Sequence, residues 1–191
     1  MRVMAVRGLT RRGAGGVVQL GPLQLPCALG RSGRKTGKRE GDGATPIGRF
    51  RLLAVLYRPD RRRRPRTRLP VRPIRPADGW CDAPTDRNYN RAVRLPYPAS
   101  AERMWRDDHL YDLVVVLDHN SRPRGRGLGS AIFMHVARPG FGATGLAGTG
   151  RKGTGLAPTS LKPTEGCIAL DVRHLERLIA GLGLGASVMI D

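Results

Sequence analysis

The chain has 191 residues, enough for one well-filled hydrophobic core, and its composition gives no reason to expect a second domain. It carries 34 lysines and arginines against 15 aspartates and glutamates, a net charge of +19, so its surface attracts polyanions such as nucleic acid, anionic lipid head groups and acidic envelope polymers. Aromatic residues make up only 5% of the chain, and no helix-turn-helix, zinc-finger or RNP pattern accompanies the charge, which argues against specific nucleic-acid binding. No run of 18 apolar residues predicts a transmembrane segment.

The first 30 residues predict short strands separated by glycine-containing turns. The apolar runs are "RVMAVRG" (2–8), "GVVQLG" (16–21) and "LQLPCALG" (23–30), as in a β-meander. The start of the chain does not resemble a secretory signal peptide, because arginines interrupt its apolar residues. Three interpretations stay open: an export signal missing from this sequence, a misassigned start, and a protein that works inside the cell.

Two long loops surround the next predicted strand. Residues 30–49 are rich in glycine and charge and have no period, whereas "FRLLAVLY" (50–57) has the content of a buried strand. A second loop is predicted over 58–110, where nine arginines and five prolines between Arg58 and Pro76 exclude a helix or a central strand. The arginine run is either a solvated loop or a binding patch.

The C-terminal half predicts the centre of the sheet and one helix. The β-branched runs 111–120 and 130–137 indicate buried strands, and a third long loop is predicted over 138–166. After a strand at 167–170, Asp171 caps a helix whose apolar residues share one face and which Gly183 ends; "ASVMID" forms the last strand. The predicted fold is mainly β, a single domain over residues 1–191.

The three cysteines, Cys27, Cys81 and Cys167, are too few for a disulfide scaffold and lack metal-site spacing. A Cys27–Cys81 bridge and two free thiols both stay open. No metal or organic cofactor is expected.

Cys167 is the candidate nucleophile. It follows Gly166 where a long loop enters the apolar run "CIAL", so main-chain amides can turn outward there as an oxyanion hole. His135, 32 residues earlier, shares a strand face with Ala131 and Phe133 by period-two alternation. A cysteine paired with a histidine suits acyl transfer, because the imidazole activates the thiol and later protonates the leaving amine. The alternative is a small core cysteine and a structural histidine.

Three segments in the same order resemble the L,D-transpeptidase catalytic domains, often called YkuD-like. They are "KREGDGATPIGRFRL" (38–52), similar to the family's "GDxxTPxGxF"; "IFMHV" (132–136), similar to its "IHG" strand end; and "TEGCIAL" (164–170), similar to its "SHGCIRL". The resemblance implies a β-sandwich or barrel in which Cys167 is the nucleophile, His135 the base and Gly166 part of the oxyanion hole.

This chain departs from the family pattern at two positions beside the cysteine. Thr164 keeps the hydroxyl of the family's serine, whereas Glu165 replaces a histidine. Glu165 is expected to orient His135, to bind a substrate ammonium group, or simply to face solvent.

The stretch 78–112 resembles a proteobacterial subgroup of the family, some of whose members form 1,3-type rather than 3,3-type crosslinks. Here Arg87, Asn88, Tyr89 and Asn90 are either a cleft for a zwitterionic diaminopimelate arm or turn-forming residues.

By resemblance, the expected function is a cysteine-dependent L,D-transpeptidase that acts on the stem peptides of peptidoglycan, free or in the sacculus. With water as the acceptor of the acyl group, it also acts as a carboxypeptidase. The resemblance implies the periplasm or cell envelope as the location. The alternative is a non-catalytic basic module, bound to the envelope or to nucleic acid, that retains the fold. The sequence does not choose between crosslink types or predict an oligomeric state.

Overall fold

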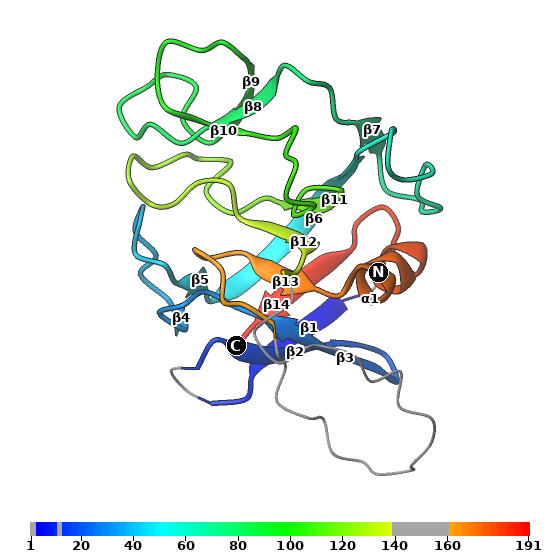
Figure 1. The fold of residues 1–191 in the computed structure, drawn as a ribbon. Coiled ribbons are helices and arrows are strands. Elements are labelled where there is room, and N and C mark those ends of the chain that lie inside the picture. The colour runs from blue at the N-terminus through cyan, green and yellow to red at the C-terminus, as the bar shows by residue number, and fades with distance from the viewer. Residues whose placement is uncertain (1–2, 11–12, 139–160) are drawn as a thin grey trace.

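The protein is built around a closed barrel of β-strands. The computed structural model describes residues 3–10, 13–138 and 161–191, and within them eight strands join side by side in the order β11-β12-β13-β3-β2-β1-β14-β6, with β6 pairing back to β11 (Figure 1). In chain order these strands are β1 (Val3–Gly8), β2 (Gly15–Leu20), β3 (Leu23–Ala28), β6 (Gly48–Tyr57), β11 (Leu113–Leu117), β12 (Phe133–Val136), β13 (Ile168–Leu170) and β14 (Ser187–Ile190). The prediction of a mainly β fold is confirmed.

Strand β6 closes the barrel because it is long enough to serve two neighbours. Its first residues pair antiparallel with β14, from Gly48↔Ile190 to Arg51↔Ser187, and its later residues pair antiparallel with β11. The short strand β7 (Val71–Pro73) adds to the end of β6 in parallel. A closed barrel leaves no long unpaired edge among these strands.

The stretches expected to be long loops carry further strands. A three-stranded sheet, here called the small sheet, consists of β8 (Asp78–Cys81), β9 (Arg91–Arg94) and β10 (Ala101–Arg103), and Figure 1 shows it at the end of the molecule away from β1, β2 and β3. Two-residue strands β4 (Arg34–Lys35) and β5 (Thr45–Pro46) pair within residues 30–49. The loop predicted over 138–166 lies mostly outside the described residues.

Two hydrophobic clusters lie on the two faces of the barrel wall at β11 and β12. Three alternate residues of β11 lie in the interior cluster: Leu113, Val115 and Leu117. Side chains from one face of the other barrel strands complete this cluster. The residues between them, Val114 and Val116, join an outer cluster with side chains from the small sheet and its loops, among them Trp80 and Met104. Strand β11 is therefore buried on both faces, which explains its continuous apolar sequence.

The one helix in the described part of the chain, α1 (Val172–Ala180), packs into the interior cluster through Leu175, Leu178 and Ile179. The Asp171 carboxylate accepts a hydrogen bond from the Arg173 N–H at 2.9 Å, so the predicted N-cap is confirmed. The helix ends at Gly181 rather than at Gly183 as expected. The Gly181 N–H donates to the Leu178 carbonyl, which tightens the last turn before the chain leaves the helix.

Part of the arginine run belongs to the folded structure and is not solvated. The Arg58 side chain is 3% exposed, pairs with Asp60, and lies over the Trp105 ring at 3.7 Å from its centroid. Arg61 donates to the buried Asp112 carboxylate at 3.0 Å and to the Arg106 carbonyl at 3.0 Å. These two arginines fasten the loop after β6 to the segment before β11.

Asn90 fastens the small sheet to the barrel. Its side-chain oxygen accepts hydrogen bonds from the Trp80 indole N–H at 2.9 Å and from the Ala131 N–H at 3.1 Å. Its amide nitrogen donates to the carbonyls of His119 and Asn120, each at 2.9 Å. The side chain is buried and its φ is +54°, a left-handed conformation that asparagine tolerates better than most residues.

We expect Asn90→Ala to lower the free energy of unfolding by at least about 2 kcal/mol, because it leaves two buried N–H groups and two carbonyls without partners. The matched control is Asn88→Ala, which removes one contact to the Tyr97 hydroxyl and should cost less than about 1 kcal/mol. Urea unfolding of both variants measures the difference. Equal losses would contradict the view that Asn90 joins the two sheets.

Candidate active site

The pairing of β12 with β13 places Cys167 and His135 on the same face of the barrel wall. The strands are parallel, with Met134 opposite Ile168 and His135 opposite Ala169. Met134 and Ile168 point into the interior cluster, so the alternate residues point outward. His135 follows Phe133 on this outer face, as predicted, and Cys167 packs against the outer cluster. Cys167 directly precedes β13 and lies two residues before Ala169, the pairing partner of His135.

A tight turn fixes the backbone of Cys167. Gly166 has φ +140°, and a Cβ at this position would lie 2.9 Å from the Ala44 carbonyl oxygen, so glycine is required. The Thr164 hydroxyl accepts from the Gly166 N–H at 3.1 Å and donates to the Cys167 carbonyl at 2.7 Å. These bonds engage the Gly166 N–H and leave the Cys167 N–H out of the turn. The Cys167 amide is thus the better oxyanion donor of the two.

A second hydroxyl holds the same carbonyl from the 30–45 segment. Thr45 donates to the Cys167 carbonyl at 3.4 Å and accepts from the Gly30 N–H at 2.8 Å. The chain beside Gly30 also pairs with the turn, because the Thr164 N–H donates to the Leu29 carbonyl at 2.9 Å. The "GDGATP" segment therefore supports the turn that carries Cys167.

The thiol of Cys167 rests in its neutral form. The Sγ donates to the Ala131 carbonyl at 3.1 Å and accepts from the Phe133 N–H at 3.4 Å. Burial raises the pKa of Cys167 to about 12, although the Phe133 N–H acts in the opposite direction. The other two cysteines are buried free thiols, so no Cys27–Cys81 disulfide forms.

His135 is held in the tautomer that a general base needs. Its Nδ1 lies 2.8 Å from the Val136 carbonyl, and because a carbonyl only accepts, the proton sits on Nδ1 and the lone pair on Nε2. The Tyr111 ring packs edge-on against the imidazole, with centroids 5.5 Å apart. Burial lowers the pKa of His135 to about 4, so the imidazole is neutral at pH 7.

Cys167 and His135 line one cavity of about 610 Å³ on the outer face of the barrel. Its walls come from the 38–41 segment, the small sheet, the chain before β12 and residues 162–169. Charged side chains of both signs surround it: Lys38, Glu40, Asp82, Glu102, Arg103, Arg106, Arg138, Lys162 and Glu165. Such a cavity suits a substrate that carries both carboxylate and ammonium groups.

The predicted substrate-binding residues separate into two groups. Thr164 and Glu165 line the cavity, but the Glu165 carboxylate contacts the Arg31 guanidinium at 2.9 Å and not His135, and its side chain is 76% exposed. The segment Arg87–Asn90 is not among the described residues that line the cavity. Its side chains make internal contacts instead, such as the bond from Asn88 to Tyr97 and the bond from the Tyr89 hydroxyl to Glu40.

Two further residues belong to the site although no sequence motif marks them. The Tyr111 hydroxyl donates to the Glu102 carboxylate at 2.7 Å, and both residues line the cavity. Burial raises the pKa of Glu102, because its carboxylate is partly removed from water beside the tyrosine ring. The sequence signal is weak, since Glu102 lies in a strand of only three residues.

The described residues contain no group of three or more His, Cys, Asp or Glu side chains arranged to hold a metal ion. Nor does the described chain include a helix with the length and apolarity needed to cross a membrane.

Comparison with known proteins agrees with this geometry. The model of the L,D-transpeptidase catalytic domain, YkuD, matches residues 14–190. No curated protein and no solved structure matches the chain. Because the family model covers nearly the whole chain, from β2 through the Cys167 turn to β14, the protein belongs to the L,D-transpeptidase catalytic domain family.

Proposed function

We propose that the protein is a cysteine-dependent L,D-transpeptidase that acts on peptidoglycan stem peptides, with Cys167 as nucleophile and His135 as general base. The observation that carries the proposal is that His135, on β12, and Cys167, directly before the paired strand β13, line one cavity in a chain of this family. Membership of the family also supports the periplasm or cell envelope as its place of action. The cavity's mixture of charges fits a stem peptide, which presents carboxylates and amines together.

The reaction begins from a neutral thiol and a neutral imidazole. When the carbonyl group of the L-centre of a stem peptide reaches Cys167, Nε2 of His135 takes the thiol proton. The sulfur then forms a bond to the carbonyl carbon. The carbonyl electron pair moves onto oxygen, where the Cys167 N–H donates to it. The C–N bond then breaks, the imidazolium returns its proton to the departing amine, and an acyl-enzyme thioester remains.

Release of the acyl group runs the same steps in reverse. An amine at a D-centre of a second stem attacks the thioester while His135 accepts its proton, which forms a crosslink; attack by water gives the carboxypeptidase reaction. Whether the crosslink is of the 1,3-type or the 3,3-type depends on which stem position supplies the acyl group. The subgroup resemblance of residues 78–112 favours testing the 1,3-type first.

The competing function is a non-catalytic basic module that keeps the fold. It would need neither a histidine with a free Nε2 lone pair nor a cysteine turn supported by two threonine hydroxyls, and both are present. These features favour the enzyme.

Cys167→Ala should abolish crosslinking of purified muropeptides and acylation by carbapenem-type β-lactams while the fold is kept, because no other thiol lines the cavity in the described residues. Mass spectrometry of the products and of the intact protein measures both reactions. The matched control is Cys81→Ala, which removes a buried thiol outside the cavity. Crosslinking that survives in Cys167→Ala refutes the nucleophile.

His135→Ala should lower kcat/KM on muropeptides by about 10²–10⁴-fold, because both the base and the acid for the leaving amine are lost. His119→Ala is the control, since that imidazole packs against Phe50 and is not among the described cavity residues. If the two variants lose activity equally, His135 has a structural role only.

The pH profile of kcat/KM reports which form of His135 is active. Only the neutral imidazole accepts the thiol proton, so activity falls as pH drops through the His135 pKa, which burial lowers to about 4. We expect kcat/KM to persist at pH 5.5, where a histidine with the ordinary pKa of about 6.5 would have lost roughly nine tenths of its neutral form. An acid limb near pH 6.5 would show that the resting histidine is not buried and neutral.

A further inference from the structure

A buried lysine lies beside the nucleophile turn. The Lys38 side chain is 4% exposed and lines the same cavity as Cys167. Two glycines make room for its stem: a Cβ at Gly129 would lie 2.9 Å from Lys38 Cγ, and a Cβ at Gly166 would lie 3.5 Å from Lys38 Cε. Because Gly166 directly precedes Cys167, the end of the lysine stem lies beside the turn that carries Cys167.

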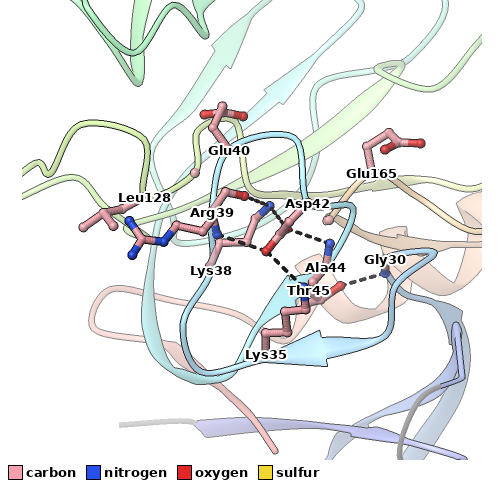
Figure 2. A network of polar contacts seen from close by, with 12 residues as sticks. Gly30, Lys35, Lys38, Arg39, Glu40, Asp42, Ala44, Thr45, Leu128 and Glu165 are labelled. Atoms are coloured by element: carbon pink, nitrogen blue, oxygen red, sulfur yellow. Dashed lines mark hydrogen bonds and ion pairs between the residues drawn. The ribbon is translucent and has the colours of Figure 1, made fainter.

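Asp42 and a backbone carbonyl hold the ammonium in place. Lys38 Nζ donates to Asp42 Oδ1 at 2.6 Å and to the Arg39 carbonyl at 2.8 Å (Figure 2). The same carboxylate accepts from the N–H groups of Arg39, at 3.0 Å, and Ala44, at 2.9 Å. Burial alone would raise the pKa of Asp42, but these hydrogen bonds outweigh it, so the pKa lies below its usual value and the carboxylate stays charged.

The ammonium keeps capacity to act on a further group. It has three N–H donors, and its two hydrogen bonds within the described part of the chain use two of them. Its own loop does not need the lysine for closure, because the two backbone N–H groups already bind Asp42. Burying a cation is costly, so a lysine kept out of water here calls for a role that uses its charge.

Glu165 stands next to Gly166 where the family has a histidine, so this position carries a carboxylate in place of a group that can be positive. This carboxylate does not neutralise Lys38. It is bound by Arg31, and Figure 2 shows it apart from the Lys38–Asp42 pair. Of the two cations Arg31 and Lys38, Arg31 is engaged by the Glu165 carboxylate, and Lys38 is the one whose stem lies against Gly166. Burial is the main influence on the Cys167 thiol and raises its pKa, and the charge of Lys38 acts against that rise.

We propose that Lys38 is the fixed positive charge of this active site, where its ammonium stabilises the Cys167 thiolate and the negative oxygen of the tetrahedral intermediate. Lys38 stays protonated throughout: the thiol proton goes to His135, and the charge that develops first on sulfur and then on oxygen is met by the ammonium. The thiolate part concerns the cysteine alone; the oxyanion part rests on the proposed transpeptidase function.

The test measures the charge at the thiol without using a substrate. Alkylation of Cys167 by iodoacetamide is followed as a function of pH, by mass spectrometry of the peptide that contains Cys167. Lys38→Met should move the alkylation profile to higher pH by about one unit, a roughly tenfold slower reaction at a fixed pH below the pKa. Asp42→Asn should move it to lower pH, because it leaves the ammonium uncompensated.

The matched control is Lys35→Met. Lys35 lies 3.9 Å from the same Asp42 carboxylate, but its side chain is 50% exposed and it is not among the described cavity residues. The Lys35→Met substitution changes the net charge by the same amount as Lys38→Met. Its pH profile of Cys167 alkylation should equal that of the parent protein. A shift equal to that of Lys38→Met would show a general charge effect and overturn the proposal.

The opposite shifts of the two variants separate charge from structure. If Lys38 and Asp42 only clip the 38–44 turn, both variants move the profile in the same direction or neither moves it, and the proposal fails. If Lys38→Met does not fold, as judged by circular dichroism, the Asp42→Asn profile alone decides: a shift to lower pH supports the charge, and no shift refutes it.

Muropeptide turnover is measured on the same variants. A Lys38→Met protein with a shifted thiol profile and about tenfold or greater loss of turnover supports both parts of the proposal. If the parent protein does not turn over muropeptides, the transpeptidase function is refuted. If Lys38→Met still shifts the alkylation profile in that case, the interaction between the lysine and the thiolate is supported on its own.

Discussion

Burial of the barrel wall on both of its faces is the constraint on which the site depends. In most barrels an outward-pointing strand residue meets solvent, but here the small sheet covers the outer face of β11 and β12. Period-two alternation sends Met134 inward and His135 outward, and both are buried. The imidazole therefore sits in a low-dielectric layer between two sheets, fixed by the strand on one side and by the Tyr111 ring on the other.

The small sheet can do this only because it is fixed to the wall. The Trp80 ring meets Phe133 edge-on, with centroids 5.0 Å apart, and the Trp80 indole N–H reaches Asn90. Asn90 in turn receives the Ala131 N–H, and the carbonyl of Ala131 accepts the Cys167 thiol. A short chain of contacts thus runs from the small sheet to the Cys167 sulfur, so the residue that joins the two sheets also positions Ala131, the hydrogen-bond partner of the Cys167 thiol.

The sequence predicts the barrel strands and two of the cavity residues, Cys167 and His135, better than it predicts their surroundings. Runs such as 111–120 and 130–137 carry their own signal, because β-branched residues buried on both faces are continuous. Cys167 and His135 stand out because their neighbours match a motif. The sequence indicates Asn90 only as a cleft or turn-forming residue and not as the link between the two sheets, because its partner Ala131 is 41 residues away and only the folded chain joins them.

The small sheet escapes prediction for a related reason. Its strands have three or four residues each and lie between turns rich in proline, arginine and aspartate, so no window long enough to show a period exists. The end of the helix is also hard to predict from sequence, because two glycines, Gly181 and Gly183, follow the apolar residues. The helix ends at the first of them, where the Gly181 N–H bonds to the last turn.

The exposed arginines and the charged cavity have different roles: the first attract a polyanion, and the second selects the ligand that binds. The net charge of +19 overstates the field available to a polymer, because Arg58 and Arg61 are used inside the fold, while Arg63 and Arg64 beside them are exposed. Exposed arginines act over distance and speed encounter with any polyanion, so they do not select a substrate. The cavity differs, since its walls carry both signs of charge: Glu102 and Arg106 pair there at 3.5 Å. The cavity therefore offers charged partners to both the positive and the negative groups of a zwitterionic ligand, so we assign selection to the cavity and capture to the surface.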